Sequence, residues 1–205
     1  MECETKEKLI VSAKAEFMEK GYTKASLRKI CANAGVTTGA LYFFFQNKED
    51  LFAAIVDKPV TELFKIMQNH FQEDEQVLSG SNVYEYQKGD HGDIAELLVH
   101  HLYENYDAFL LLLTKAQGTR FEHVLDQIVE VTEKNYLQTA KSMASKMPEI
   151  KVNEYMGHWM AHMTIDAYVH LLTHETDEQS ALIYSKMMMD YIVKGWMEMV
   201  LVGKD

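Results

Sequence analysis

The chain has 205 residues, of which 47% are hydrophobic, and a formal net charge of −11. Its two prolines and ten glycines are too few for a β-protein of this length, so the composition predicts an all-α fold. The first fifteen residues carry too many charges for a signal peptide, and the longest apolar run, residues 108–113, is far too short to span a membrane. We therefore expect a cytoplasmic protein with no membrane partner.

The charged residues are unevenly distributed along the chain. Residues 1–50 hold eight Lys or Arg against seven Asp or Glu, whereas residues 51–205 hold twelve against twenty-four. Because the field near the docking face decides whether DNA is attracted, the nearly neutral N-terminal part is compatible with contact to DNA despite the acidic total.

The first fifty residues contain the signals of three helices. Between residues 5 and 20 apolar side chains recur at helical spacing, and Gly21 follows where a C-terminal cap is expected. Ser26 is a suitable N-cap for a second helix that Gly35 closes, and Thr37 is a suitable N-cap for a third, short helix. Two short helices separated by a glycine-containing turn, with a helix on either side, predict a helix-turn-helix unit.

The remainder of the chain also shows helical spacing. Asn47 and Asp50 resemble a capping box at the start of a fourth helix. We expect this helix to continue through Phe71, with a kink or an interruption at Pro59. Residues 73–92 lose the helical period and collect Gly, Ser, Asn and Asp, which predicts a long loop. Four further helices are expected over residues 93–117, 119–147, 151–174 and 177–202.

The third helix contains five consecutive large apolar residues, LYFFF. Successive residues of a helix turn by about 100°, so the five side chains cannot all face one core. Leu41, Phe44 and Phe45 are expected to face the preceding helices. Tyr42 and Phe43 then project to the other side, where something other than the core must contact them.

The segment GYTKASLRKICANAGVTTGALYFFFQNKEDLF, residues 21–52, resembles the DNA-binding motif of the TetR family of bacterial transcriptional regulators. The shared features are a glycine–aromatic pair, a Ser/Thr cap, Ala-Gly-Val, a Thr-Gly pair, Leu-Tyr, an aromatic cluster and Lys-Glu-x-Leu in one register. The resemblance implies an N-terminal three-helix helix-turn-helix DNA-binding domain, residues 1–50. It also implies a larger helical C-terminal domain, residues 51–205, that binds an effector and dimerises.

In the TetR family the helix that carries the aromatic cluster lies in the major groove of DNA. Tyr42 would then offer a hydroxyl to a phosphate, and Phe43 an apolar contact to a thymine methyl. Lys48 would add a cation for a second phosphate at the start of the fourth helix. The residues expected to contact DNA are Arg28, Thr37, Thr38, Gly39, Ala40, Tyr42, Phe43 and Lys48.

Long apolar stripes on the last two predicted helices fit the dimerisation that the resemblance implies, although such stripes can also serve only to bury the core of one chain. The residues expected in the dimer interface are Met156, Met160, Ala167, Leu182, Met187 and Tyr191.

Thirteen methionines and many aromatic residues suit an adaptable pocket for a lipophilic or aromatic small molecule. The residues expected to line this pocket are Tyr103, Tyr106, Phe109, Phe121, Tyr136, Trp159 and Met163.

His158, His162, Asp166, His170 and His174 recur every four residues along one predicted helix. Such a row drifts by about 40° per step, so the five side chains cannot share one metal ion. We interpret the row as a polar flank of the helix and predict no metal and no cofactor. The sequence also lacks a nucleophile–base arrangement, a P-loop and a glycine-rich cofactor motif, which argues against an enzyme.

We therefore expect a ligand-responsive TetR-like transcriptional regulator that acts as a repressor. It would bind a pseudo-palindromic stretch of double-stranded operator DNA as a homodimer and be released by a small lipophilic or aromatic effector. The alternative is a helical carrier or sensor of a small molecule or metal that uses the His158–His174 row. Ala25 and Phe44, which replace residues that frequently contact phosphate in the family, and the acidic balance support this alternative.

Overall fold

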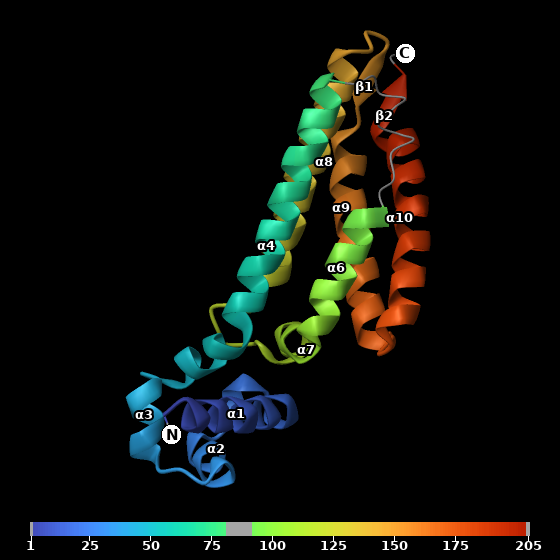
Figure 1. Ribbon diagram of the computed structural model, residues 1–205. Helices are drawn as coiled ribbons and strands as arrows, with labels where there is room; N and C mark the ends of the chain where they lie inside the picture. The colour runs from blue at the N-terminus through green and yellow to red at the C-terminus, as the bar shows by residue number, and fades with distance from the viewer. Residues whose placement is uncertain (1, 81–91, 204–205) are drawn as a thin grey trace. The chain divides into compact units, whose positions relative to one another are not determined.

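The computed structural model describes residues 2–80 and 92–203 (Figure 1). Within these ranges the chain forms helices and one small two-stranded sheet, so the predicted all-α fold class is confirmed.

The chain divides into two compact units. The N-terminal unit comprises residues 1–62 and 105–124, and the C-terminal unit comprises residues 63–104 and 125–205. The division that the sequence suggests after residue 50 therefore falls within a helix, and the N-terminal unit includes a second segment that lies much later in the chain.

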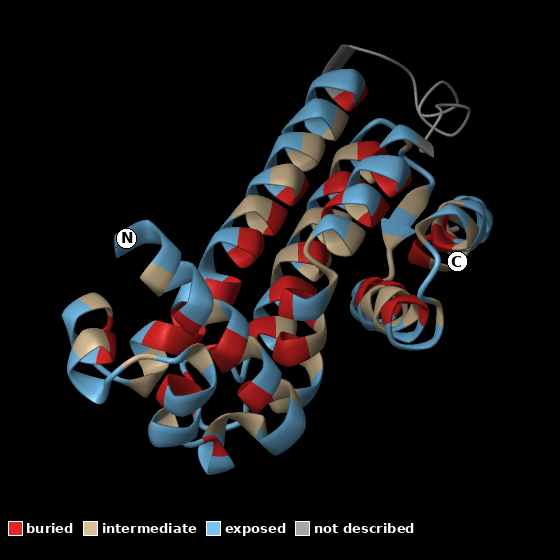
Figure 2. Cartoon of the chain, turned by 60° about the horizontal axis from the view of Figure 1, so that its bottom comes forward, coloured by how far each residue is buried: buried red, intermediate tan, exposed pale blue. Residues whose placement is uncertain are grey.

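The N-terminal unit is built from α1, α2, α3, α7 and the first part of α4. Their bounds are α1 (Glu2–Lys24), α2 (Leu27–Ala34), α3 (Thr38–Phe44), α4 (Lys48–Gly80) and α7 (Tyr106–Lys115). α1 is broken at Gly21, whose φ of 73° is readily adopted only by glycine. Leu9, Phe17, Ile30 and Phe52 are fully buried. The buried residues lie on the inner sides of the helices (Figure 2).

The predicted starts of α2, α3 and α4 are confirmed by their N-caps. The side chains of Ser26, Thr37 and Asn47 each accept a hydrogen bond from the backbone N–H three residues later, at 3.4, 3.1 and 2.9 Å. Gly35 closes α2 with a φ of 68°, as its position in the sequence predicts. These local bonds place α2 and α3 on either side of a tight turn.

The C-terminal unit contains the second part of α4, further helices and the sheet. These elements are α6 (Gly92–Glu104), α8 (Val124–Ser145), α9 (Glu154–His174), α10 (Glu178–Val200), β1 (Ile150–Val152) and β2 (Leu201–Gly203). α10 packs against α6 and α9 (Figure 1). β1 and β2 pair antiparallel, with Lys151 opposite Val202, and so join the start of α9 to the end of α10.

The structure corrects the loop expected over residues 73–92. α4 continues through Gly80, and residues 81–91 lie outside the described part of the chain. Tertiary contacts extend the helix: Leu78 is buried in the core of the C-terminal unit, and its carbonyl accepts a hydrogen bond from the Lys146 ammonium. Packing thus outweighs the weak helical signal of this segment.

Pro59 lies inside α4, where the sequence predicts a kink or an interruption, and the helix does not end there. A proline lacks the N–H that would bond to the carbonyl four residues earlier. Val56 and Val60 on either side of it are buried, so apolar packing holds the helix together across the missing bond.

Two other predicted helices are divided or shortened in the structure. The helix expected over residues 93–117 is split at Asn105, and α8 begins at Val124 rather than at Thr119. Before α8 the chain forms a turn, in which Gly118 has a φ of 85° and the Thr119 hydroxyl donates to a backbone carbonyl three residues earlier at 2.7 Å. The sequence does not predict β1 and β2, because three-residue strands show no readable alternation.

Candidate nucleic-acid interface

The third helix, α3, has one buried side and one exposed side. Leu41 is fully buried and Phe45 is 3% exposed, whereas Tyr42 is 56% and Phe43 71% exposed. Phe44 is half-buried between the rings of its two neighbours. The predicted division of the LYFFF run is therefore confirmed except at Phe44, which is expected in the core but is only half-buried, and α3 presents two aromatic side chains to solvent.

Most residues expected to contact DNA are accessible in the N-terminal unit. Ala40 and Lys48 are half-buried, and the exposed ones are Arg28, Thr37, Thr38, Gly39, Tyr42 and Phe43. A Cβ atom built on Gly39 would meet only the Thr37 hydroxyl, at an ordinary 3.7 Å. The fold of the unit therefore does not require glycine at position 39, and the absent side chain leaves room for another molecule to approach the backbone.

Lys48 makes contacts within the protein that the sequence does not reveal. Its ammonium donates to the carbonyls of Thr23 and Ala25, both at 3.1 Å, and lies 4.8 Å from the centre of the Tyr22 ring. Burial lowers the pKa of this ammonium. These contacts hold the start of α4 against the C-terminal end of α1. Since an ammonium has three donors, one N–H remains for another acceptor.

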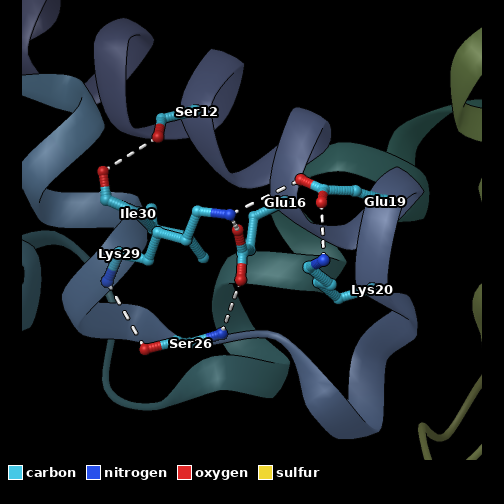
Figure 3. Close-up of polar contacts among 7 residues, drawn as sticks. All are labelled: Ser12, Glu16, Glu19, Lys20, Ser26, Lys29 and Ile30. Atoms are coloured by element: carbon cyan, nitrogen blue, oxygen red, sulfur yellow. Dashed lines mark hydrogen bonds and ion pairs between the residues drawn. The ribbon is translucent and has the colours of Figure 1, made fainter.

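A buried acid fixes α2 on α1 (Figure 3). The Glu16 carboxylate is 4% exposed, accepts from the Ser26 backbone N–H at 3.2 Å and pairs with the Lys29 ammonium at 3.2 Å. The hydrogen bond between Lys29 and Glu16, together with the charge of Glu16, raises the pKa of Lys29. On the same side of α2, the Ser12 hydroxyl donates to the Ile30 carbonyl at 2.8 Å. Sequence reasoning missed these residues, because on α1 Glu16 resembles an ordinary surface acid.

The second segment of the N-terminal unit, residues 105–124, holds the first turns of α4. The backbone N–H of Arg120 donates to the Glu49 carboxylate at 2.8 Å, and its guanidinium pairs with Asp57 at 3.2 Å. Phe121, one residue on, has its ring centre 6.1 Å from that of Phe52. The helix that follows α3 is thus fixed by residues about seventy positions later, for which the local sequence carries no signal.

The residues expected in the dimer interface do not form a single exposed face. Met160 is only 1% exposed within the core of the C-terminal unit, whereas Met187 and Tyr191 are 67% and 70% exposed. The half-buried positions are Met156, Ala167 and Leu182. The large apolar side chains that are exposed on α9 and α10 are Tyr155, Trp159, Ile183, Tyr184, Met187 and Tyr191.

The residues expected to line a pocket are distributed over both units. Those in the N-terminal unit are Tyr106, Phe109 and Phe121. Those in the C-terminal unit are Tyr103, Tyr136, Trp159 and Met163. Tyr136 and Met163 pack on the same core cluster, whereas Trp159 is 42% exposed. The Tyr103 hydroxyl donates to the Glu175 carbonyl at 2.7 Å.

The histidine row of α9 is divided into pairs. The ring centres of His158 and His162 are 4.7 Å apart, and those of His170 and His174 are stacked at 4.0 Å. His158 contacts the Glu133 carboxylate at 2.8 Å. In residues 2–80 and 92–203, no three His, Cys, Asp or Glu side chains are grouped to hold a metal ion. None of the described helices is long and apolar enough to cross a membrane.

The helix-turn-helix region is similar to known regulators in sequence. Residues 9–55 match the family model described as bacterial regulatory proteins, tetR family. Over 55 residues the chain is 40% identical to the HTH-type transcriptional repressor BepR of Brucella suis biovar 1 (strain 1330). This match covers 27% of the chain and 26% of BepR, so it spans about a quarter of either protein.

Solved structures share the fold along most of the chain. A transcriptional regulator from Aquifex aeolicus is similar with a TM-score of 0.58 at 18% identity, over 92% of this chain and 99% of that one. The TetR family regulator PfmR from Thermus thermophilus is similar with a TM-score of 0.59 at 18% identity, over 91% and 97% of the two chains. At such identities the likeness concerns the fold alone. The N-terminal region therefore carries the helix-turn-helix motif of the tetR family, and the fold of the chain is similar to that of known regulators of this family.

Proposed function

We propose that the protein is a sequence-specific, DNA-binding transcriptional regulator and that α3 reads the DNA. The observation that carries the proposal is the exposure of Tyr42 and Phe43 beside the fully buried Leu41. The second helix of a helix-turn-helix unit contacts DNA in the major groove, and these two neighbouring side chains on α3 would be available for such contacts. The protein would act by binding rather than by catalysis.

The chemistry of α3 suits the major groove. This groove is about 12 Å wide and admits one helix. The Tyr42 hydroxyl would bond a phosphate, and the Phe43 ring would pack against a thymine methyl. Gly39 and Ala40 would let the backbone come close to the DNA. Lys48 would use its remaining N–H for a second phosphate, with a smaller contribution than a free lysine because its other contacts hold it in place.

We propose that the regulator is a homodimer formed through α9 and α10. On α10 the exposed Ile183, Met187 and Tyr191 recur every four residues, and on α9 the exposed Tyr155 and Trp159 have the same spacing. Residues at this spacing lie on one side of a helix, and two adjacent helices with apolar sides can form half of a four-helix interface. A second copy would supply the other half and the second helix-turn-helix unit.

A lipophilic or aromatic effector would regulate DNA binding. It would bind in the C-terminal unit and favour a state of the dimer whose two α3 helices no longer fit successive major-groove faces. Because a ligand with equal affinity for both states shifts nothing, release requires tighter binding to the state that does not fit DNA. The relative BepR is named a repressor, which supports repression as the direction of control. Such a regulator acts in the cytoplasm, where the operator is.

The proposal is tested by selecting bound duplexes from a random DNA pool with the purified full-length protein. We expect an enriched inverted repeat, with binding that weakens as salt rises, because phosphate contacts release counterions. No enrichment at any salt concentration, after removal of co-purified ligand, would contradict DNA reading. If that protein still bound small molecules, the carrier alternative would replace the regulator.

A further inference from the structure

Four exposed histidines lie on α9 in two pairs. His158 pairs with His162 and His170 with His174, each pair four positions apart on the helix. The side chains of the whole row drift around the helix and cannot share one ion, whereas two residues four positions apart are neighbours on its surface. Two imidazoles at this spacing on one side of a helix can bind one metal ion. The proposed contacts with DNA use neither pair.

A carboxylate of α8 orients the His158 ring. Nδ1 of His158 lies 2.8 Å from Oε2 of Glu133, and the two side chains are 50% and 30% exposed. A carboxylate only accepts hydrogen bonds, so Nδ1 carries the proton and the lone pair of the neutral ring lies on Nε2. Histidines that bind metal ions commonly bond a carboxylate or a carbonyl through their other ring nitrogen, which fixes the ring. Glu133 therefore leaves Nε2 of His158 available to a metal ion.

The inclination of the rings distinguishes the two pairs. A ring nitrogen binds a metal ion along its lone pair, which lies in the ring plane, at about 2.0–2.1 Å for zinc. The ring centres of His158 and His162 are 4.7 Å apart and the planes are inclined by 67°, so the planes intersect close to both rings. The stacked rings of His170 and His174 are inclined by only 20°, so their planes meet far from both rings. Of the two pairs, the first can direct two lone pairs to one ion without unstacking.

The second pair also differs in its surroundings. Nδ1 of His174 lies 2.9 Å from the His170 carbonyl and 3.0 Å from the Thr173 hydroxyl, which are both neutral groups. The Glu133 carboxylate beside the first pair adds a negative charge, which favours a bound cation. The second pair has the same residue type, spacing and exposure on the same helix, so it is a matched control for the first.

The donor atoms indicate the class of ion. Imidazole nitrogen suits zinc, copper, iron and nickel, whereas magnesium and calcium prefer oxygen ligands. Among the described residues, no three His, Cys, Asp or Glu side chains are grouped to hold an ion, so a site of two imidazoles leaves the other coordination positions to water. Such an open site follows the general order of affinities, in which Ni²⁺ and Cu²⁺ stand high.

We propose that His158 and His162 together bind one divalent transition metal ion through their ring nitrogens. Glu133 acts through His158 and is a positioning residue rather than a ligand. The site lies within one chain, so it depends neither on DNA binding nor on a second copy of the protein.

Calorimetric titration of the full-length protein with Ni²⁺ tests the site. The protein carries no histidine tag, is freed of metal with a chelator and contains Cys3→Ser, because the exposed Cys3 thiol could bind the ion itself. We expect one Ni²⁺ per chain and no binding of Mg²⁺. His158→Gln and His162→Gln should each weaken Ni²⁺ binding at least about tenfold, because a single imidazole loses the advantage of two linked ligands. The double variant His170→Gln/His174→Gln should bind Ni²⁺ unchanged.

Two substitutions of Glu133 test its effect on His158. Glu133→Ala removes the acceptor and should weaken Ni²⁺ binding about tenfold, the lower end of the range for groups that orient a metal-binding histidine. Glu133→Gln keeps an oxygen that can accept from Nδ1 and should therefore weaken binding less. Unchanged binding in Glu133→Ala would refute the positioning role.

Three outcomes would overturn the site itself: no binding of Ni²⁺, binding of Mg²⁺ as tight as that of Ni²⁺, or a loss in the His170/His174 variant as large as in the variants of the first pair. None of these measurements uses DNA. A protein that bound Ni²⁺ as expected but selected no DNA sequence would refute the regulator and leave the metal site standing, and the reverse result would refute only the metal site.

Discussion

Glu16 in the N-terminal unit and Trp196 in the C-terminal unit are almost equally buried, at 4% and 5% exposure, but only Glu16 has polar partners. The Glu16 carboxylate joins α1 to the start of α2 through Ser26 and Lys29, whereas the Trp196 N–H faces an apolar, methionine-rich cluster. The buried polar atom of the first unit thus joins two helices, whereas that of the second lies among apolar side chains.

The apolar cores of the two units differ in the same sense. In the N-terminal unit Phe17 and Phe52 pack edge to face with ring centres 5.2 Å apart, and Tyr22 contacts both rings. In the C-terminal unit the fully buried Met143 and Met160 occupy the centre. Aromatic rings have few rotamers and specific contact geometry, whereas methionine adapts to what surrounds it. We expect the first core to tolerate truncation much less than the second.

The largest expected effect tests this difference directly. Phe17→Ala should lower the free energy of unfolding by about 4 kcal/mol, since it leaves a large cavity between rigid rings. Met160→Ala should cost about 2 kcal/mol, since neighbouring methionines can close the space. Urea unfolding at one protein concentration measures both. Far-UV circular dichroism follows the whole chain, and tryptophan fluorescence follows the C-terminal unit, which contains Trp159 and Trp196. If Met160→Ala cost as much unfolding free energy as Phe17→Ala, or more, the expected difference between the two cores would be contradicted.

Loss of the buried acid should come next in size. Glu16→Ala leaves the Ser26 N–H without its acceptor and Lys29 without its buried partner. We expect a loss of about 2 kcal/mol of unfolding free energy. Glu19→Ala is the matched control, because Glu19 also contacts Lys29 but is exposed, and little change is expected there. Similar urea midpoints for the two variants would show that the carboxylate does not fix α2.

The third prediction separates the effect of Phe43 on DNA binding from its effect on stability. Phe43→Ala should weaken binding to the selected DNA by at least about tenfold, the discrimination of one good base contact. Its unfolding free energy should stay within about 0.5 kcal/mol of the original, because the side chain is 71% exposed. Val11→Ala, at a 65% exposed apolar residue of α1, should change neither quantity. An equal loss of DNA binding in the two variants would show that the Phe43 side chain of α3 does not contact the DNA.

What could be predicted from the sequence is what depends on nearby residues. Ser26, Thr37 and Asn47 each bond an N–H only three positions away, so the starts of α2, α3 and α4 are readable as local patterns. The opposite orientations of Leu41 and Phe43 follow from helical geometry alone.

What could not be predicted depends on residues far apart in the chain. The end of α4 is held by Lys146, which bonds a carbonyl 68 positions earlier, and the start of α4 by Arg120, 71 positions after Glu49. Lys48 has the expected position at the start of α4. Its contacts with two carbonyls near the end of α1 could not be foreseen, because no pattern places that turn against it. The unpaired Trp196 donor is likewise a property of packing alone.

The smallest expected effect concerns pH and the Lys29 ammonium, which lies 3.2 Å from Glu16 and 3.5 Å from Glu19. The hydrogen bond to Glu16 is the main reason that its pKa is raised above the ordinary value of 10.5. A raised pKa stabilises the folded state fully below the unfolded value, and this contribution is lost as pH rises through the folded value. The stability difference between the original protein and Lys29→Met should therefore be constant up to about pH 10 and shrink above it.

Urea midpoints between about pH 8 and about pH 11 measure this difference, and Lys24→Met, at an exposed lysine near the end of α1, serves as the control. Titration of the other lysines and of the tyrosines is common to all three proteins, so it cancels in the differences. A Lys29→Met difference that stayed constant to the highest pH would mean that Glu16 holds α2 through the Ser26 N–H alone. The packing of α2 on α1 would then depend on a neutral hydrogen-bond donor and not on an ion pair.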